Sequence, residues 1–288
     1  MIQSHLLSAR ARLQEVTASP QLEAEILLAH VLDQPRCYLH AHSDESLPKK
    51  SADRFLKYVE RRAAKEPIAY LTGQRSFWSL ELQVTPNTLI PRQETECVVE
   101  TVLSLFPDRQ SALEIVDLGT GSGAIALALG YEYSRARVVG IDASAAALEI
   151  AKTNAKTMQS ENVQFHLGDW NTSLNLPHSQ QFDLIVTNPP YLTQEEWEKD
   201  AKGLHFEPAI ALVGGEDGLQ AIKRIITSAI PLLKFGGYLV IEHGYEQKIS
   251  VSQLLQLAGF RDIFSVQDLL GYDRVTAACY DRQNVIGE

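Results

Sequence analysis

Short apolar runs alternate with segments of helical periodicity through the second part of the chain. Each run is only a few residues long, as expected for buried strands rather than helices. The runs lie at residues 113–116, 138–141, 163–167, 184–186 and 238–241, around residue 263, and at 275–279. Strands that alternate with helices in this way indicate a mostly parallel sheet with helices on both faces, as in α/β folds.

The first part of the chain has a different pattern. Apolar residues recur at helical spacing over residues 22–29, directly after Ser19–Pro20, a favourable helix start. A later apolar stripe over residues 55–63 ends before Pro67. These patterns predict a small helical bundle within residues 1–73.

A stretch of short alternating segments follows the predicted bundle. We interpret residues 74–92 as a β-hairpin neck, because the segments around 77–84 and 89–90 are too short for helices. The α/β domain is then expected over residues 93–288. A chain of 288 residues is long enough for two domains.

Composition indicates the compartment in which the protein is expected. Hydrophobic residues make up 45% of the chain, but no run of 18 apolar residues occurs, and the start lacks the pattern of a signal peptide. Cys37, Cys97 and Cys279 are scattered without metal-ligand spacing, and the eight histidines do not cluster. We therefore expect a cytoplasmic protein with free thiols, without a metal site and without a membrane partner.

Charge is divided unevenly along the chain. Residues 1–75 carry 11 basic and 9 acidic residues, whereas the remainder carries 15 basic and 27 acidic residues. A net charge of −12 on the α/β part makes it a poor platform for a nucleic-acid backbone. The same charge could simply provide solubility, or suit a protein partner with a basic surface.

Four consecutive residues, Asn188, Pro189, Pro190 and Tyr191, follow the apolar run at 184–186. A strand cannot continue through two prolines, because proline fixes φ and donates no N–H to the ladder. The chain must turn here, at the edge where open α/β sheets bind ligands. The Asn188 side-chain oxygen and the Pro189 carbonyl could each accept an N–H from a planar amino or amide group, with the Tyr191 ring over its face. Taken alone, the motif is also compatible with a simple strand-ending turn.

A glycine-rich loop follows the apolar run at 113–116 and precedes an alanine-rich helical segment. It contains Asp117, Gly119, Thr120, Gly121, Ser122 and Gly123. Glycines let the backbone approach a ligand closely, and the helix start presents free N–H groups. The loop has neither the GxGxxG spacing of dinucleotide sites nor the lysine of a P-loop. A nucleoside without a pyrophosphate fits better, and S-adenosylmethionine is the candidate cofactor.

Two further strand ends carry acidic residues. Asp142 follows the run at 138–141, where a carboxylate can bind both hydroxyls of a ribose; it could also cap the next helix. Asp169 and Trp170 follow the run at 163–167, and a carboxylate with an indole could hold an adenine there. A packing role is the alternative for Trp170.

Together, the glycine loop, Asp142 and the turn at 188–191 resemble the class I S-adenosylmethionine-dependent methyltransferases that methylate nitrogen. The chain is more closely similar to the bacterial release factor glutamine methyltransferases. This similarity spans nearly the whole chain and rests on residues 27–28, 70–73, 89–96, 206–208, 214–219, 241–244 and 271–275. The segments at 89–96 and 206–219 are the most specific. One departure is Gln93, where the family usually has proline.

The resemblance implies a Rossmann-like class I methyltransferase sheet, mostly parallel with an antiparallel last strand, beside the helical bundle and the hairpin neck. It implies that S-adenosylmethionine methylates the glutamine of the Gly-Gly-Gln motif in bacterial class I peptide chain release factors, leaving S-adenosylhomocysteine. The helical domain would dock the factor, and the enzyme would act as a monomer. Catalysis is assigned to Asn188, Pro189, Pro190 and Tyr191, and cofactor binding to Asp117, Gly119, Thr120, Gly121, Ser122, Gly123, Asp142, Asp169, Trp170 and Asn188.

The expected chemistry needs orientation more than acid–base catalysis. An amide nitrogen is a weak nucleophile, and two acceptors on its N–H groups would localise the lone pair and aim it at the methyl group. The proton leaves easily after transfer, so no histidine base is required. We interpret His243 as a structural residue, whereas the role of Glu242 stays open.

Three other functions are compatible with parts of the sequence. A glutamine methyltransferase for a ribosomal protein would share the catalytic turn and a helical N-terminal region. A DNA adenine or RNA guanine N-methyltransferase would share the turn, because its flipped base also presents a flat NH2 group. The acidic α/β part and the lack of a basic, aromatic-rich recognition domain argue against a nucleic-acid substrate. A non-catalytic cofactor-binding adaptor would not need the turn at 188–191.

Overall fold

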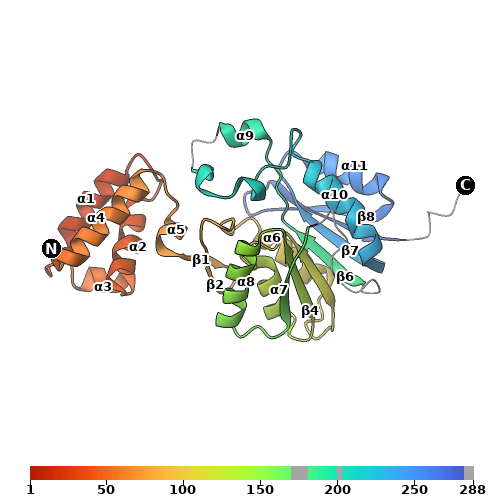
Figure 1. Cartoon of the computed structure of the whole chain (residues 1–288), viewed down its shortest axis with the longest axis horizontal. Coiled ribbons are helices and arrows are strands. Elements are labelled where there is room, and N and C mark those ends of the chain that lie inside the picture. Colours follow the sequence, from red (N-terminus) through yellow and green to blue (C-terminus); the bar gives the residue numbers. More distant parts are fainter. Residues whose placement is uncertain (170–180, 200–202, 282–288) are drawn as a thin grey trace, which may run out of the picture. The chain divides into compact units, whose positions relative to one another are not determined.

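The computed structural model describes residues 1–169, 181–199 and 203–281 of the chain. These residues form two compact units, drawn in Figure 1. The first unit is Met1–Gln74 together with residues 203–206, and the second comprises the other described residues. Each unit has a hydrophobic core of its own.

The first unit is a bundle of five helices. They are α1 (Ile2–Leu13), α2 (Pro20–Leu32), α3 (Arg36–Ala41), α4 (Lys49–Ala63) and α5 (Ile68–Thr72). Helix α2 begins at Pro20, as the Ser19–Pro20 pair predicts, and it packs against α1, α3, α4 and α5. Its residues Leu27 and Leu28 are fully buried, so α2 is the central helix of the bundle. The short 3₁₀ turn Leu204–Phe206 also belongs to this unit.

A two-stranded hairpin follows the bundle in sequence, with β1 (Gln74–Phe77) and β2 (Leu80–Gln83). Its turn includes Trp78, which has a left-handed backbone at φ 56°. Phe77 and Leu82 point into the core of the second unit and are at most 1% exposed. The hairpin is therefore anchored to that core by one side chain from each strand.

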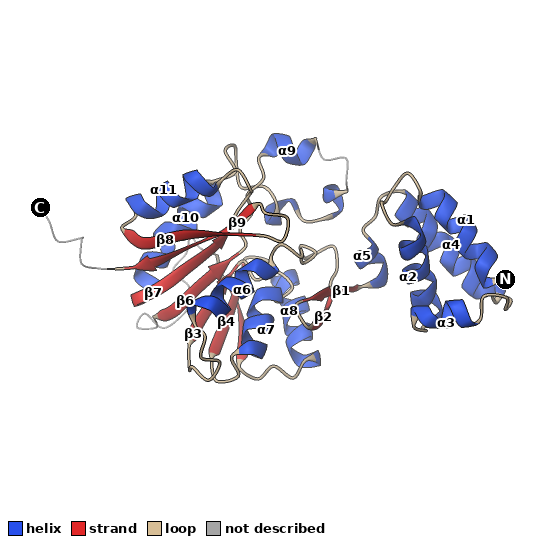
Figure 2. Cartoon of the chain, turned by 180° about the vertical axis from the view of Figure 1, so that it is seen from behind, coloured by secondary structure: helices blue, strands red, loops and turns tan. Residues whose placement is uncertain are grey.

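A seven-stranded sheet forms the centre of the second unit (Figure 2). Its strands are β3 (Glu114–Leu118), β4 (Arg137–Asp142), β5 (Val163–Leu167), β6 (Phe182–Thr187), β7 (Leu233–Glu242), β8 (Phe260–Gln267) and β9 (Asp273–Tyr280). The spatial order is β5-β4-β3-β6-β7-β9-β8. Strands β5, β4, β3, β6 and β7 pair in parallel, and β9 is antiparallel to both of its neighbours. The prediction of a mostly parallel sheet with an antiparallel last strand is confirmed.

Alternate residues along the central strands build two separate cores. In β3, Ile115 belongs to the core covered by α6 (Glu96–Leu105) and α7 (Ala124–Glu132), with α8 (Ala145–Thr157) beside them. Val116 belongs to the opposite core, which α10 (Gln220–Ala229) and α11 (Lys248–Leu257) cover. Helices thus cover both faces, as expected for a parallel sheet. The remaining helical segments are α9 (Gln194–Glu198) and the 3₁₀ turns Ala209–Ala211 and Ile230–Leu232.

Candidate active site

A cavity of about 430 Å³ lies at the carboxyl ends of β3, β4 and β6. It is the kind of position where open α/β sheets bind ligands. The structure brings six of the predicted site residues to its wall: Gly119, Gly121, Asp142, Asp169, Asn188 and Pro190. The predicted Trp170 lies outside the described residues.

The glycine loop after β3 adopts a conformation that needs glycine. Gly119, Gly121 and Gly123 all have positive φ, at 78°, 57° and 85°. The backbone N–H groups of Gly119 and Thr120 both donate to the Ile141 carbonyl, at 2.8 and 2.9 Å. The loop is thereby fixed to the end of β4 with Gly119 and Gly121 at the cavity.

Asp117 is not among the residues that line the cavity, and its side chain instead stabilises the glycine loop. It is 1% exposed, and its Oδ2 accepts hydrogen bonds from the Thr120 hydroxyl at 2.6 Å and the Ala126 N–H at 3.2 Å. Burial raises the pKa of Asp117 to about 7. Within the described residues its Oδ1 has no hydrogen-bond partner.

Ser122 and Gly123 end the loop and are not among the residues that line the cavity. The Ser122 carbonyl accepts a hydrogen bond from Asn154 on α8 at 2.9 Å. Gly123 is the N-cap of α7, and its N–H donates to the Thr120 carbonyl at 2.8 Å. Thr120, Ser122 and Gly123 therefore shape the loop that carries the two cavity-lining glycines.

Asp142, the last residue of β4, faces the cavity and binds the glycine loop. Its Oδ2 accepts the Gly121 N–H and its Oδ1 accepts the Ser144 N–H, each at 2.8 Å. Ser144, not Asp142, is the N-cap of α8, and its hydroxyl accepts the Ala147 N–H. Burial raises the pKa of Asp142. A carboxylate has about four acceptor positions, so these backbone bonds leave capacity for a ligand hydroxyl.

The predicted catalytic turn follows β6, which ends at Thr187. The Asn188 side chain lines the cavity, and its Nδ2 donates to the Thr95 hydroxyl at 3.0 Å. Pro189 and Pro190 are buried, with Pro190 at the cavity wall. The Tyr191 hydroxyl donates to Glu242 Oε1 at 3.3 Å, away from the cavity-lining set.

A loop at residues 212–218 holds this turn through the backbone. The Leu192 N–H donates to the Leu212 carbonyl at 2.9 Å, and the Gly214 N–H donates back to the Leu192 carbonyl at 2.8 Å. A Cβ on Gly214 would lie 2.4 Å from the Pro190 carbonyl oxygen. Glycine is required there because the two backbones touch. This contact gives a physical reason for Gly214 in the segment 214–219, which the sequence connected to the site only through the family resemblance.

Glu207 joins two walls of the cavity. One oxygen of this buried carboxylate accepts the Ile90 N–H at 2.9 Å, and the other forms an ion pair with Arg92. Leu89 and Pro208, the residues next to this junction, both line the cavity. The two segments are far apart in the sequence, and no local pattern in either indicates that they meet.

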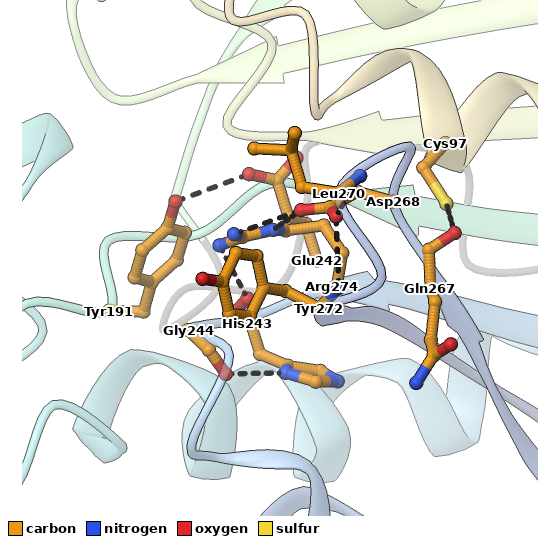
Figure 3. A network of polar contacts seen from close by, with 10 residues as sticks. All are labelled: Cys97, Tyr191, Glu242, His243, Gly244, Gln267, Asp268, Leu270, Tyr272 and Arg274. Atoms are coloured by element: carbon orange, nitrogen blue, oxygen red, sulfur yellow. Dashed lines mark hydrogen bonds and ion pairs between the residues drawn. The ribbon is translucent and has the colours of Figure 1, made fainter.

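A polar network lies behind the catalytic turn (Figure 3). Glu242, at the end of β7, is fully buried, and burial raises its pKa to about 7. Arg274 of β9 pairs with Asp268 at 3.2 Å and, by its charge, lowers the pKa of Glu242. None of these three residues was predicted as part of the site, and Glu242 was noted only as ambiguous.

His243 is buried in the same region with both ring nitrogens in hydrogen bonds. Nδ1 lies 2.9 Å from the Gly244 carbonyl and must donate to it, so Nε2 accepts from the Thr276 hydroxyl at 2.8 Å. Burial lowers the pKa of His243, which favours this neutral form. The ring has no free nitrogen to act as a base. Among residues 1–169, 181–199 and 203–281, no group of three or more His, Cys, Asp or Glu side chains could hold a metal ion.

Each of the two units matches a known protein family. Residues 109–267 match the methyltransferase domain family, and residues 5–73 match the PrmC N-terminal domain family. The release factor glutamine methyltransferase of Vibrio cholerae is 42% identical over 282 residues, covering 97% of this chain and 96% of the relative. The protein of the same name from Escherichia coli is 38% identical, covering 92% and 94%. In fold, a methyltransferase structure from Pyrococcus furiosus matches with a TM-score of 0.51 and 14% identity, covering 78% of this chain and 98% of that one.

Proposed function

Because the chain belongs to the release factor glutamine methyltransferase family, we propose that it methylates the side-chain amide of the glutamine in the Gly-Gly-Gln motif of peptide chain release factors. The methyl donor is S-adenosylmethionine. The observation that carries the proposal is Asn188 at the cavity wall, with its NH2 group turned to Thr95. The other end of that amide is an acceptor suited to an N–H of the substrate.

The cavity fits the proposed cofactor. Its walls combine close backbone at Gly119 and Gly121 with a carboxylate at Asp142, the combination that a nucleoside with a free ribose diol needs. Asp142 is already fixed by two backbone N–H groups and would accept the ribose hydroxyls, with Asp169 at the same wall. The bound sulfonium supplies an activated methyl group. Asp117, Thr120, Ser122 and Gly123 would act by shaping the loop.

The catalytic turn offers the substrate two acceptors. The Asn188 Oδ1 and the Pro189 carbonyl would each accept one N–H of the glutamine amide. Within the described residues no donor pairs with the Pro189 carbonyl, whereas the Tyr191 carbonyl accepts Gln247 Nε2 at 3.0 Å. Holding both N–H groups turns the nitrogen lone pair toward the methyl group, and in-line transfer follows without a covalent enzyme intermediate.

Proton removal needs no side chain of the site. The amide nitrogen becomes strongly acidic once it is methylated, so its extra proton passes to water. His243 supports this view, because both of its nitrogens are occupied and it is fully buried. The contribution of the chain is therefore binding and orientation.

The partner is proposed to be a protein and not a nucleic acid. The net charge of −12 on residues 76–288 opposes binding to a phosphate backbone. Helices α1 to α5 form a unit with its own core, which supports a separate docking role for residues 1–73. We place the reaction in the cytoplasm, where release factors work, and propose that the enzyme acts as a monomer.

Methyl transfer from labelled S-adenosylmethionine tests the proposal. The substrates are a purified release factor, the same factor with its Gly-Gly-Gln glutamine changed to alanine, a ribosomal protein, and DNA. Label on the intact factor that is lost from the alanine variant is the expected result. Label only on the ribosomal protein or on DNA would overturn the proposed substrate.

A further inference from the structure

Thr95 stands at the start of helix α6, but its side chain makes no capping hydrogen bond. A threonine at the N-cap usually accepts a hydrogen bond from a backbone N–H of the first turn. In the described structure Thr95, the N-cap of α6, makes no such bond. Thr95 is 3% exposed, and its hydroxyl oxygen instead accepts a hydrogen bond from Nδ2 of Asn188, 93 residues away in the chain. A residue expected to stabilise a helix is therefore bonded to the proposed catalytic amide.

The buried Glu242 carboxyl is the acceptor available to the hydrogen of the Thr95 hydroxyl. Thr95 lowers the pKa of this carboxyl, and within the described residues Glu242 Oε2 has no hydrogen-bond partner. Oε1 of Glu242 also accepts the Tyr191 hydroxyl at 3.3 Å. One buried carboxyl thus accepts the hydroxyl of Tyr191 in the catalytic turn, as Figure 3 shows, and interacts with Thr95, the partner of Asn188.

The donor and acceptor roles in these contacts determine the orientation of the Asn188 amide. When the Thr95 hydroxyl turns its hydrogen to Glu242, its oxygen is left to accept, and only the NH2 end of Asn188 can donate to it, as the 3.0 Å contact has it. The amide oxygen of Asn188 then faces the opposite way. The two ends of an amide have nearly the same shape, so packing alone would not choose between them. A reversed amide would present NH2 to the NH2 of the substrate and could not accept a hydrogen bond.

We propose that Glu242 and Thr95 are positioning residues that hold Asn188 with its amide oxygen toward the substrate. The proposal rests on the proposed function, since it assigns Asn188 Oδ1 as the acceptor of a substrate N–H. It also explains why a carboxyl group is kept at a fully buried position, where burial carries a large cost. Preorganised acceptors speed a reaction because they need no rearrangement during it.

Four variants separate positioning from general structural support. Thr95→Val removes the hydroxyl at nearly constant shape, and Thr95→Ser restores it. Glu242→Leu removes both acceptors, and Glu242→Gln keeps one amide oxygen for Thr95 and Tyr191. We expect Thr95→Val and Glu242→Leu to lower kcat about tenfold or more, the loss of roughly one well-placed hydrogen bond. Thr95→Ser and Glu242→Gln should recover most of the rate, with the Kd for S-adenosylmethionine within about threefold of wild type in all four.

A merely structural role predicts a different result. The valine and serine variants would then share the same kcat, or the loss would follow the Tm and the cofactor Kd. Either outcome overturns the positioning role. The proposed function is tested separately, by methylation with the wild-type enzyme.

A measurement that needs no turnover tests the positioning role even if the wild-type enzyme fails to methylate a release factor. The side-chain NH2 signal of Asn188 in nitrogen-15 spectra is assigned by its absence from Asn188→Ala. We expect slow hydrogen exchange of this group in the wild type and in Thr95→Ser, and exchange at least tenfold faster in Thr95→Val. Equal exchange in all three proteins would refute the positioning role.

Discussion

Glu207 forms an ion pair with Arg92, and the two residues lie 115 positions apart in the chain. The same carboxylate accepts the Ile90 N–H at 2.9 Å, so one buried side chain joins the wall that includes Leu89 to the wall that includes Pro208. The cavity therefore depends on a long-range polar contact as well as on the sheet.

Replacing that carboxylate should loosen the cavity. We expect Glu207→Ala to weaken S-adenosylmethionine binding about tenfold or more, because it leaves the Ile90 N–H and the Arg92 guanidinium without their acceptor. Calorimetric titration measures the effect. Glu216→Ala, which removes an exposed carboxylate from a nearby loop, is the matched control and should bind the cofactor normally. Equal affinities of the two variants would contradict the role given to Glu207.

Asp142 should matter for cofactor affinity more than for folding. Asp142→Asn keeps the shape but removes the charge that would bind the ribose hydroxyls and replaces one acceptor of the Gly121 and Ser144 N–H groups by an NH2 group, and we expect the Kd to rise by about 10- to 100-fold. Asp262→Asn changes an exposed residue whose φ of 50° asparagine tolerates, and it should leave the Kd unchanged. A cofactor Kd near the wild-type value for Asp142→Asn would remove Asp142 from the binding site.

The contact between Gly214 and the catalytic turn gives a steric prediction. Gly214→Ala would place a Cβ 2.4 Å from the Pro190 carbonyl oxygen, so the turn must move, and we expect kcat to fall by about 100-fold. Gly259→Ala tests the cost of a side chain where space is open but φ is 87°. That control should lose about 1 kcal/mol of stability and keep its activity. Normal turnover by Gly214→Ala would show that the turn tolerates displacement.

Buried carboxyl groups should make stability fall as pH rises. The pKa of Glu242 is about 7 in the folded protein, above its ordinary value of 4.5, so the folded state binds the proton more tightly. Its contribution is complete below pH 4.5 and is lost as the pH rises to 7 and above. Glu242→Gln cannot ionise, and it should raise the free energy of unfolding by about 3 kcal/mol at pH 8 and by less than half of that at pH 5.5.

Urea unfolding of Glu242→Gln and wild type at both pH values measures this difference. Asp117 should contribute with the same sign, because burial raises its pKa from 3.8 to about 7. A wild-type protein whose stability rises between pH 5.5 and 8, with no gain in the glutamine variant, would contradict the prediction.

Removing residues 1–73 should separate docking from chemistry. The remaining chain keeps the sheet, both cores and every cavity-lining residue, so we expect it to bind S-adenosylmethionine with unchanged affinity. Methylation of an intact release factor should fall by about 100-fold or more, whereas methylation of a short Gly-Gly-Gln peptide should persist. Full activity of the shortened enzyme on the intact factor would exclude a docking role for the helical unit.

Local patterns predicted the parts of the molecule that depend on nearby residues. The apolar run at 163–167 matches β5, and the two prolines after β6 end that strand as their chemistry requires. Periodicity does not fix which strands become neighbours. The antiparallel last strand was accessible only through a family resemblance, and the position of β9 between β7 and β8 was not predicted. The pairings of Asn188 with Thr95 and of Glu207 with Ile90 were not predictable, because each joins segments that no local signal connects.

The position of β9 has a consequence for synthesis of the protein. Strand β8 leaves the ribosome before β9, yet its place in the sheet exists only after β9 has paired with β7. The helical unit can fold while translation continues, since domains generally fold as units from the N-terminal end. The catalytic unit has to wait for β9, so the Arg274 side chain reaches Asp268 behind the catalytic turn only after residues 273–280 have left the ribosome.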